Sequence, residues 1–159
     1  TATFVKPAPM RPFEVEGVGE CYLAAWNTNR MRQMFRLGTV RDQSEVSLKL
    51  AQAWLQNLKN GDGGLGFLQI MRGFENTQEK EDLYVGSVAN LDVPMQLIWG
   101  EFDTAMSWEQ YGIPIRDTFG ITRVTMVPSG HFLQEDNAVA IVEQIVDMIE
   151  SSRRRHRGV

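Results

Sequence analysis

The sequence predicts an α/β fold in which a helical part is followed by two parallel strands. Two short apolar segments, one within residues 93–103 and one at 124–127, have the composition of buried strands. The segment between them, with a helix expected from about 105 to 119, is long enough for a parallel crossover. The first of these strands is apolar on both sides apart from Gln96, which is typical of a parallel sheet with helices on both faces.

The N-terminal part is predicted to begin extended and then become helical. Residues 7–12 are proline-rich and are expected to run extended, since proline does not continue a helix. From about Gly19 to Leu37 the apolar residues fall on approximately one face of a helix. Gly38 fits the end of that helix.

Two further helices and a turn complete this part. A second amphipathic helix is predicted over residues 48–58, preceded by Ser44 and Ser47. A third, weaker helix is predicted from Leu65 to Met71, ending at Gly73. Residues 79–82 are all charged, and we interpret them as a solvated turn that leads back toward the sheet.

The chain ends in a predicted amphipathic helix and a basic tail. Asp136 or Asn137 marks the start of the helix, whose apolar positions are Ala138, Ile141, Val142, Ile145, Met148 and Ile149. We interpret the basic run at 153–157 as cations near a helix C-terminus that continue into a frayed tail. With a net charge of -4 for the whole chain, nucleic-acid binding is not expected.

The composition is that of a globular domain, with 159 residues of which 43% are hydrophobic. Apolar runs are far shorter than the roughly 20 residues that cross a bilayer, so no membrane association is expected. The first residues lack a signal-peptide layout. The single cysteine, Cys21, cannot form an internal disulfide, which agrees with a reducing compartment, and we expect a cytoplasmic protein. Without a Cys or His cluster no metal site is predicted.

A carboxylate and an imidazole follow the two predicted strands. Asp103 comes after the first strand in Gly-Glu-Phe-Asp, and His131 comes after the second in Gly-His. Because a parallel βαβ unit places the carboxyl ends of both strands at one edge of the sheet, we expect these side chains to meet there. Glu101 competes for the acid role, since strand alternation puts it on the same side as Asp103.

These motifs resemble the C-terminal part of an α/β-hydrolase. The resemblance is closest to the epoxide hydrolase and haloalkane dehalogenase branch and is carried by residues 100–103 and 130–136. It implies a partial α/β-hydrolase fold: a helical cap over residues 1–90, then the last two strands and the C-terminal helix over residues 91–159. It also implies that Asp103 orients His131 as the catalytic base, with no cofactor.

The resemblance further implies a small apolar organic substrate, namely an epoxide, a haloalkane or an ester. Four residues near the expected reacting edge are candidates for substrate contact, although ordinary packing is an equally good interpretation of each: Trp99, Phe102, Met106 and Phe132.

The nucleophile of such an enzyme is missing from the chain. It belongs on a strand-to-helix elbow before the acid, usually Gly-x-Ser-x-Gly or with Asp in place of Ser. Residues 60–64 are the nearest imitation, but they follow a helical pattern and lack the first glycine, so we predict a helix end and loop there. Ser87, Ser107 and Ser129 also lack an elbow.

Two interpretations of this absence stay open. In the first, an upstream segment supplies the nucleophile and the oxyanion hole and completes the sheet, or two copies associate through open strand edges. In that case an Asp nucleophile fits epoxides and haloalkanes, and a Ser nucleophile fits esters. In the second, the chain is a non-catalytic ligand-binding or interaction protein of α/β-hydrolase ancestry.

Overall fold

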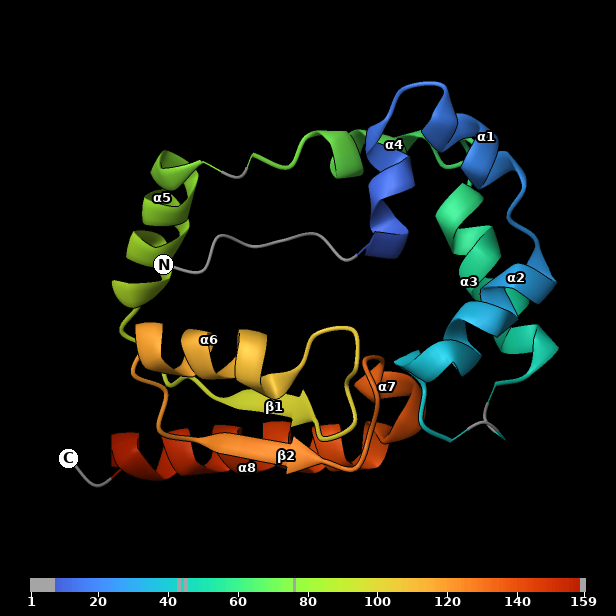
Figure 1. Cartoon of the computed structure of the whole chain (residues 1–159). Coiled ribbons are helices and arrows are strands. Elements are labelled where there is room, and N and C mark those ends of the chain that lie inside the picture. Colours follow the sequence, from blue (N-terminus) through green and yellow to red (C-terminus); the bar gives the residue numbers. More distant parts are fainter. Residues whose placement is uncertain (1–7, 43, 45, 76, 158–159) are drawn as a thin grey trace. The chain divides into compact units, whose positions relative to one another are not determined.

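The computed structural model describes residues 8–42, 44, 46–75 and 77–157 (Figure 1). The described residues divide into two compact units. The first unit lies within Thr1–Arg36 and Val46–Glu81, and the second lies within Leu37–Glu45 and Asp82–Val159. This division differs from the expected one at residue 90. The boundary falls after Glu81, inside a helix, and residues 37–45 belong with the strands. The chain is mostly helical with one small parallel sheet, which is compatible with the α/β class.

Short helices make up the first unit. They are the 3₁₀ helix η1 (Ala8–Glu14), α1 (Val18–Ala24), α2 (Thr28–Met34), α3 (Leu48–Lys59) and α4 (Leu65–Arg72). Two elements span a boundary between the units, the π-helical turn η2 (Phe35–Thr39) and α5 (Gln78–Ala89). The expectation of an extended start is wrong for the described residues, since Pro12 lies inside η1. Proline fixes φ near a helical value, so it is compatible with a 3₁₀ turn. Pro7 lies outside the described residues.

The prediction of a single helix from Gly19 to Leu37 is also wrong, because the helix is interrupted between α1 and α2. Asn27 is extended and its Oδ1 accepts hydrogen bonds from the backbone N–H groups of Asn29 and Arg30, both at 3.1 Å. Asparagine is among the best N-cap residues, so it starts a new helix here. Gly38 does not end the helical run, which continues through η2.

The helices α3 and α4 follow the prediction, whereas α5 was not predicted. Ser47 Oγ caps α3 by accepting from Leu50 N at 3.0 Å. Gly73 follows α4 as its C-cap. The expected turn at 79–82 is wrong, since these residues lie in the first turns of α5. Carboxylates are favourable at a helix N-terminus, which explains how so polar a segment begins a helix.

The core of the first unit is a cluster of aromatic rings. Phe13 is 1% exposed and makes edge-to-face contacts with Tyr22, Trp26 and Phe67 at centroid distances of 5.1, 5.9 and 5.0 Å. Leu68 is fully buried beneath the same ring cluster. Apolar packing therefore holds η1, α1 and α4 together.

One polar pair lies beside this core. Arg72 donates to both carboxylate oxygens of Glu20 at 2.8 Å. This hydrogen bond is the main reason that the pKa of Glu20 is lowered from 4.5 to about 2. The pair joins α1 to the end of α4.

The second unit contains the parallel sheet and the helices that cover it. β1 (Leu97–Gly100) pairs with β2 (Val124–Val127), with Leu97 opposite Val124 and Gly100 opposite Val127. The second strand matches the prediction, and the first begins later than expected. The predicted crossover is present as the π-helical turn η3 (Trp108–Gly112) and α6 (Ile113–Thr118). The chain closes with α7 (Leu133–Asp136) and α8 (Ala138–Arg157).

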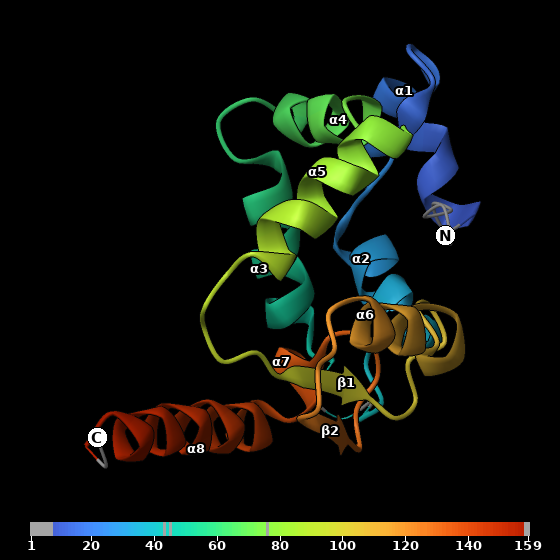
Figure 2. The same cartoon turned by 90° about the vertical axis from the view of Figure 1, so that its left-hand side faces the viewer.

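Helices cover opposite faces of this sheet (Figure 1). On one face the ring of Trp99 packs edge-on against Trp108 of η3, with centroids 5.8 Å apart. On the other face Thr125 Oγ1 donates to Gln144 Oε1 of α8 at 2.9 Å. The expectation of a frayed basic tail is wrong for the backbone, which stays helical to Arg157. Figure 2 shows the C-terminal end of α8 projecting away from the strands.

Parts of the second unit remain uncovered in the described residues. The sheet has two strands there, so each strand has an outer edge without a strand partner. Apolar side chains on α8 are exposed as well, namely Val139, Val142, Ile145, Val146 and Ile149. Among the described helices, none is both long and apolar enough to span a bilayer.

Candidate acid-base site

The turn after β1 and the segment after β2 are hydrogen-bonded to each other. Glu101 N donates to Val127 O at 2.8 Å, and Phe102 N donates to Ser129 O at 3.0 Å. Both segments leave the sheet at its carboxyl edge, so these bonds hold the segment after β1 beside the segment after β2. Asp103 lies in the segment after β1.

Gly100 permits this close approach. A Cβ atom at Gly100 would collide with the backbone oxygens of Ser129 and Gly130. These are main-chain atoms, which cannot move aside as a flexible side chain can. The glycine of the Gly-Glu-Phe-Asp motif is therefore required by the packing of the two turns.

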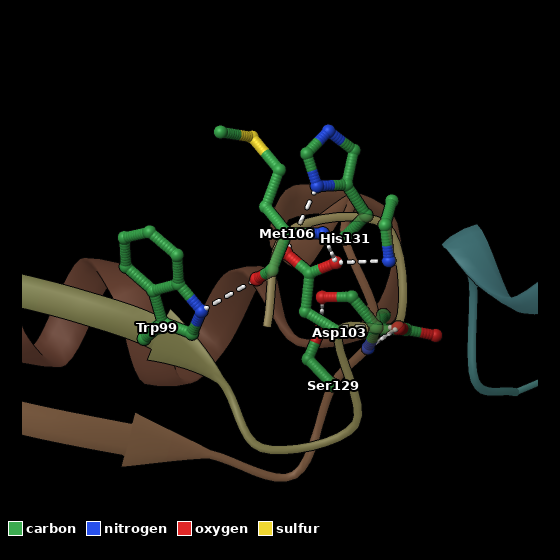
Figure 3. A network of polar contacts seen from close by, with 8 residues as sticks. Trp99, Asp103, Met106, Ser129 and His131 are labelled. Atoms are coloured by element: carbon green, nitrogen blue, oxygen red, sulfur yellow. Dashed lines mark hydrogen bonds and ion pairs between the residues drawn. The ribbon is translucent and has the colours of Figure 1, made fainter. Parts of the chain in front are cut away.

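Asp103 is buried and held in one orientation. Its side-chain Oδ1 accepts the backbone N–H groups of Ala105 at 2.9 Å and Met106 at 2.8 Å. Its other oxygen, Oδ2, lies 2.9 Å from His131 Nδ1 (Figure 3). The predicted meeting of Asp103 and His131 is thus confirmed, while their catalytic role stays a prediction.

The imidazole of His131 is oriented by this contact. A carboxylate acceptor at Nδ1 requires a proton on that nitrogen, and the neutral ring then has its lone pair on Nε2. Figure 3 shows this second nitrogen pointing away from Asp103, and no described residue hydrogen-bonds to it. The side chain is 32% exposed, so Nε2 can accept a proton from a molecule that reaches it.

The pKa of His131 is raised above its ordinary value of 6.5. The hydrogen bond that His131 donates to Asp103 is the main cause; partial burial opposes it, and the charge of Asp103 adds to it. An imidazole that gains a proton is therefore stabilised by its partner. This is the property required of a general base.

The other sequence candidates lie around the pair with different contacts. Glu101 is exposed, and its carboxylate makes no hydrogen bond or ion pair with His131 in the described structure. The Phe132 ring packs edge-on against the His131 ring at 5.2 Å, and the Phe102 ring is 43% exposed. Trp99 Nε1 donates to Met106 O at 3.1 Å, so both of these residues have a packing role in the turn.

The serines considered as nucleophiles have structural hydrogen bonds. Ser129 is fully buried, and its Oγ donates to Asp136 Oδ2 at 3.0 Å. Ser107 Oγ caps η3, and Ser87 Oγ donates to a backbone oxygen one turn earlier in α5.

The nearest imitation of a nucleophile elbow, residues 60–64, is a loop after α3. The carboxylate of Asp62 accepts from Gly64 N and Gly66 N at 2.7 Å. The prediction of a helix end and loop there is confirmed.

Asp136 is the residue that sequence reasoning missed, having been assigned only to a helix start. Its carboxylate accepts the backbone N–H groups of Arg41, Asp42 and Gly130 and the hydroxyl of Ser129. Burial opposes ionisation of Asp136, but together these donors outweigh it and lower its pKa. The one available indication was the position of Asp136 in the 130–136 segment.

Metal-binding side chains are not grouped together in the part of the chain that the structure describes. Within the described residues no set of three or more His, Cys, Asp or Glu side chains could hold a metal ion. Comparison with known proteins adds no assignment, since no protein-family model, curated protein or solved structure matches the chain.

Proposed function

We propose that the chain supplies the acid and base of an α/β-hydrolase. His131 acts as the general base through Nε2, and Asp103 fixes the ring and stabilises its protonated form. The observation that carries the proposal is the 2.9 Å contact between Asp103 Oδ2 and His131 Nδ1, with Nε2 unbonded among the described residues. The two amide donors on Asp103 support it, because they hold the carboxylate in place before the proton moves.

Two reactions fit this pair. With an Asp nucleophile, its carboxylate attacks a carbon of an epoxide or haloalkane, and the C–O or C–halogen bond breaks. This leaves an enzyme ester, with the halide released or the epoxide oxygen protonated by water. His131 then removes a proton from water as the oxygen of that water attacks the ester carbonyl; the acyl C–O bond breaks, and the proton passes from His131 to the departing alcohol. With a Ser nucleophile, His131 takes the serine proton as the serine oxygen attacks an ester carbonyl; the acyl C–O bond of the substrate breaks, and His131 gives the proton to the departing alcohol. Water cleaves the acyl-enzyme by the same sequence. In both cases Asp103 stabilises the imidazolium.

The nucleophile and oxyanion hole would come from a complementing segment. The unpartnered strand edges support this part of the proposal, because added strands would pair there. The helical part up to residue 90 would serve as the cap. The residues proposed to contact a small apolar organic substrate are Trp99, Phe102, Met106 and Phe132.

The test compares the chain alone with the chain co-expressed with the coding sequence directly upstream of Thr1. Each preparation is assayed with an aryl ester, an epoxide and a haloalkane. The expected result is hydrolysis in the co-expressed sample, reduced about 10²- to 10⁴-fold by His131→Ala. Glu101→Gln is the matched control and should retain activity. Equal activity in His131→Ala and the native protein would refute the proposal.

A non-catalytic ligand-binding protein is the second candidate. The observation that favours it is that Ser87, Ser107 and Ser129 each have a structural hydrogen bond elsewhere, so none of these three serines is placed as a nucleophile for His131. The same assay decides between the two. Saturable binding of an apolar compound with no turnover, and with solution mass unchanged by the upstream segment, would support this candidate.

A further inference from the structure

A short strap of chain, Thr39–Asp42, is hydrogen-bonded to the segment that carries His131. The carboxylate of Asp136 makes the connection and receives donors from both sides. Arg41 N lies 2.8 Å from each of its oxygens, and Asp42 N lies 2.9 Å from Oδ1. Gly130 N donates to Oδ2 at 2.7 Å. One side chain thus joins segments 95 positions apart.

His131 lies between two of these tethered points. Its preceding residue, Gly130, is held by Asp136, and its following residue, Phe132, donates its backbone N–H to Thr39 O at 2.8 Å. The backbone on both sides of the imidazole is therefore fixed to the strap or to the side chain that binds it. Rotation of the ring away from Asp103 is left to the side-chain torsions alone.

The strap also reaches the turn that carries Asp103. The Arg41 guanidinium carbon lies 3.9 Å from the centroid of the Phe102 ring, a cation–π arrangement. Phe102 directly precedes Asp103. The strap therefore contacts the segment after β1 through the Phe102 ring and the segment after β2 through the Asp136 carboxylate.

We infer that Asp136 is a positioning residue: by binding the strap to the His131 segment it sets the geometry of the Asp103–His131 pair. The inference rests on the proposed function only for its consequence in catalysis. The contacts themselves set an imidazole and a carboxylate in register whether or not turnover follows.

Only an ionised carboxylate suits this position. The donors that face Asp136 are three backbone N–H groups and the Ser129 hydroxyl, spread over both oxygens. Asparagine offers one acceptor oxygen and would turn its NH₂ group toward N–H donors. Asp136→Asn therefore keeps the shape of the side chain and disconnects one of the two segments.

Nuclear magnetic resonance of the histidines tests this directly. The chain has 2 histidines, so a His156→Gln background leaves His131 as the single imidazole. In that background we expect Asp136→Asn to lower the pKa of His131 toward its ordinary value and to weaken the preference for the proton on Nδ1. Ser129→Ala, which removes one donor, should shift both in the same direction but less. Asp117→Asn, a change at an exposed carboxylate of the same unit, is the control and should shift neither.

The outcomes are distinct. A folded Asp136→Asn protein with native His131 pKa and protonation overturns the inference. So does an Asp136→Asn protein that fails to fold together with native values in Ser129→Ala, because the carboxylate would then act on the fold alone. In an active preparation Asp136→Asn should reduce kcat on the order of 10²-fold with little change in KM. The predicted resonance shifts without turnover in any preparation would leave the inference standing and remove the hydrolase proposal.

Discussion

The helical unit and the strand-bearing unit are stabilised by different interactions. In the first, Phe13 and Leu68 are buried within a cluster of aromatic and aliphatic side chains. In the second, the buried residues at the strand exits include Asp103 and Ser129, which are polar and hydrogen-bonded. Apolar packing stabilises without fixing a direction, whereas hydrogen bonds to a carboxylate fix distance and angle. The difference indicates that apolar packing supplies the stability of the first unit, whereas hydrogen bonds control the geometry at the strand ends of the second.

The largest expected effect is on the apolar cluster. Phe13→Ala should lower the free energy of unfolding by about 3–5 kcal/mol, because a fully buried ring leaves a cavity among three others. Urea denaturation measures the loss. Val18→Ala, at a side chain 51% exposed, is the control and should change stability by about 0.5 kcal/mol or less. A loss below about 1 kcal/mol for Phe13→Ala would contradict the role given to the cluster.

A single added methyl group should disturb the packing between the segments that follow β1 and β2. Gly100→Ala is expected to destabilise by about 1–3 kcal/mol, since the new Cβ meets main-chain oxygens of Ser129 and Gly130. Gly86→Ala, in α5 with nothing within 4 Å of the new Cβ, should instead stabilise by up to about 1 kcal/mol. Equal effects of the two substitutions in thermal unfolding would show that the turns are not in tight contact.

The acid–base pair should make stability depend on pH. The raised pKa of His131 means that the folded protein binds this proton more tightly than the unfolded chain. The associated stability is fully present below pH 6.5 and is lost as pH rises through the folded pKa. Asp103→Asn should lower the pKa of His131 and flatten this part of the pH profile.

Unfolding measurements from about pH 5 to pH 9 would record this change. Glu101→Gln serves as the matched control, because Glu101 makes no hydrogen bond or ion pair with His131 in the described structure, and it should leave the profile unaltered. A profile flattened by Glu101→Gln and not by Asp103→Asn would reverse the assignment of the acid.

The smallest effect is expected at the polar pair beside the aromatic cluster. Glu20, with a pKa lowered from 4.5 to about 2, contributes stability that is present above pH 4.5 and lost as pH falls toward 2. Glu20→Gln should remove this acid-sensitive part, as should Arg72→Met. Acid titration of the unfolding free energy measures it. An unchanged acid limb in both variants would mean that the pair contributes nothing.

Much of the fold was predictable where the signals are local. The apolar run at 124–127 matches β2, and the amphipathic pattern over residues 48–58 matches α3. Predictions failed where short-range signals compete. An asparagine cap at Asn27 interrupts an otherwise helical pattern, and the acidic segment at 79–82 is helical although it contains little to pack.

The sequence by itself determined the Asp103–His131 pair, because parallel strands end at one edge and each strand is followed by a distinctive residue. Only the tertiary structure decided the role of Asp136. Its main partners are backbone N–H groups of Arg41, Asp42 and Gly130, which residues of almost any type provide, so no residue type marks them in the sequence. Two of those partners, Arg41 and Asp42, also lie in a strap 95 and 94 positions away, and only the folded chain brings them within hydrogen-bonding distance.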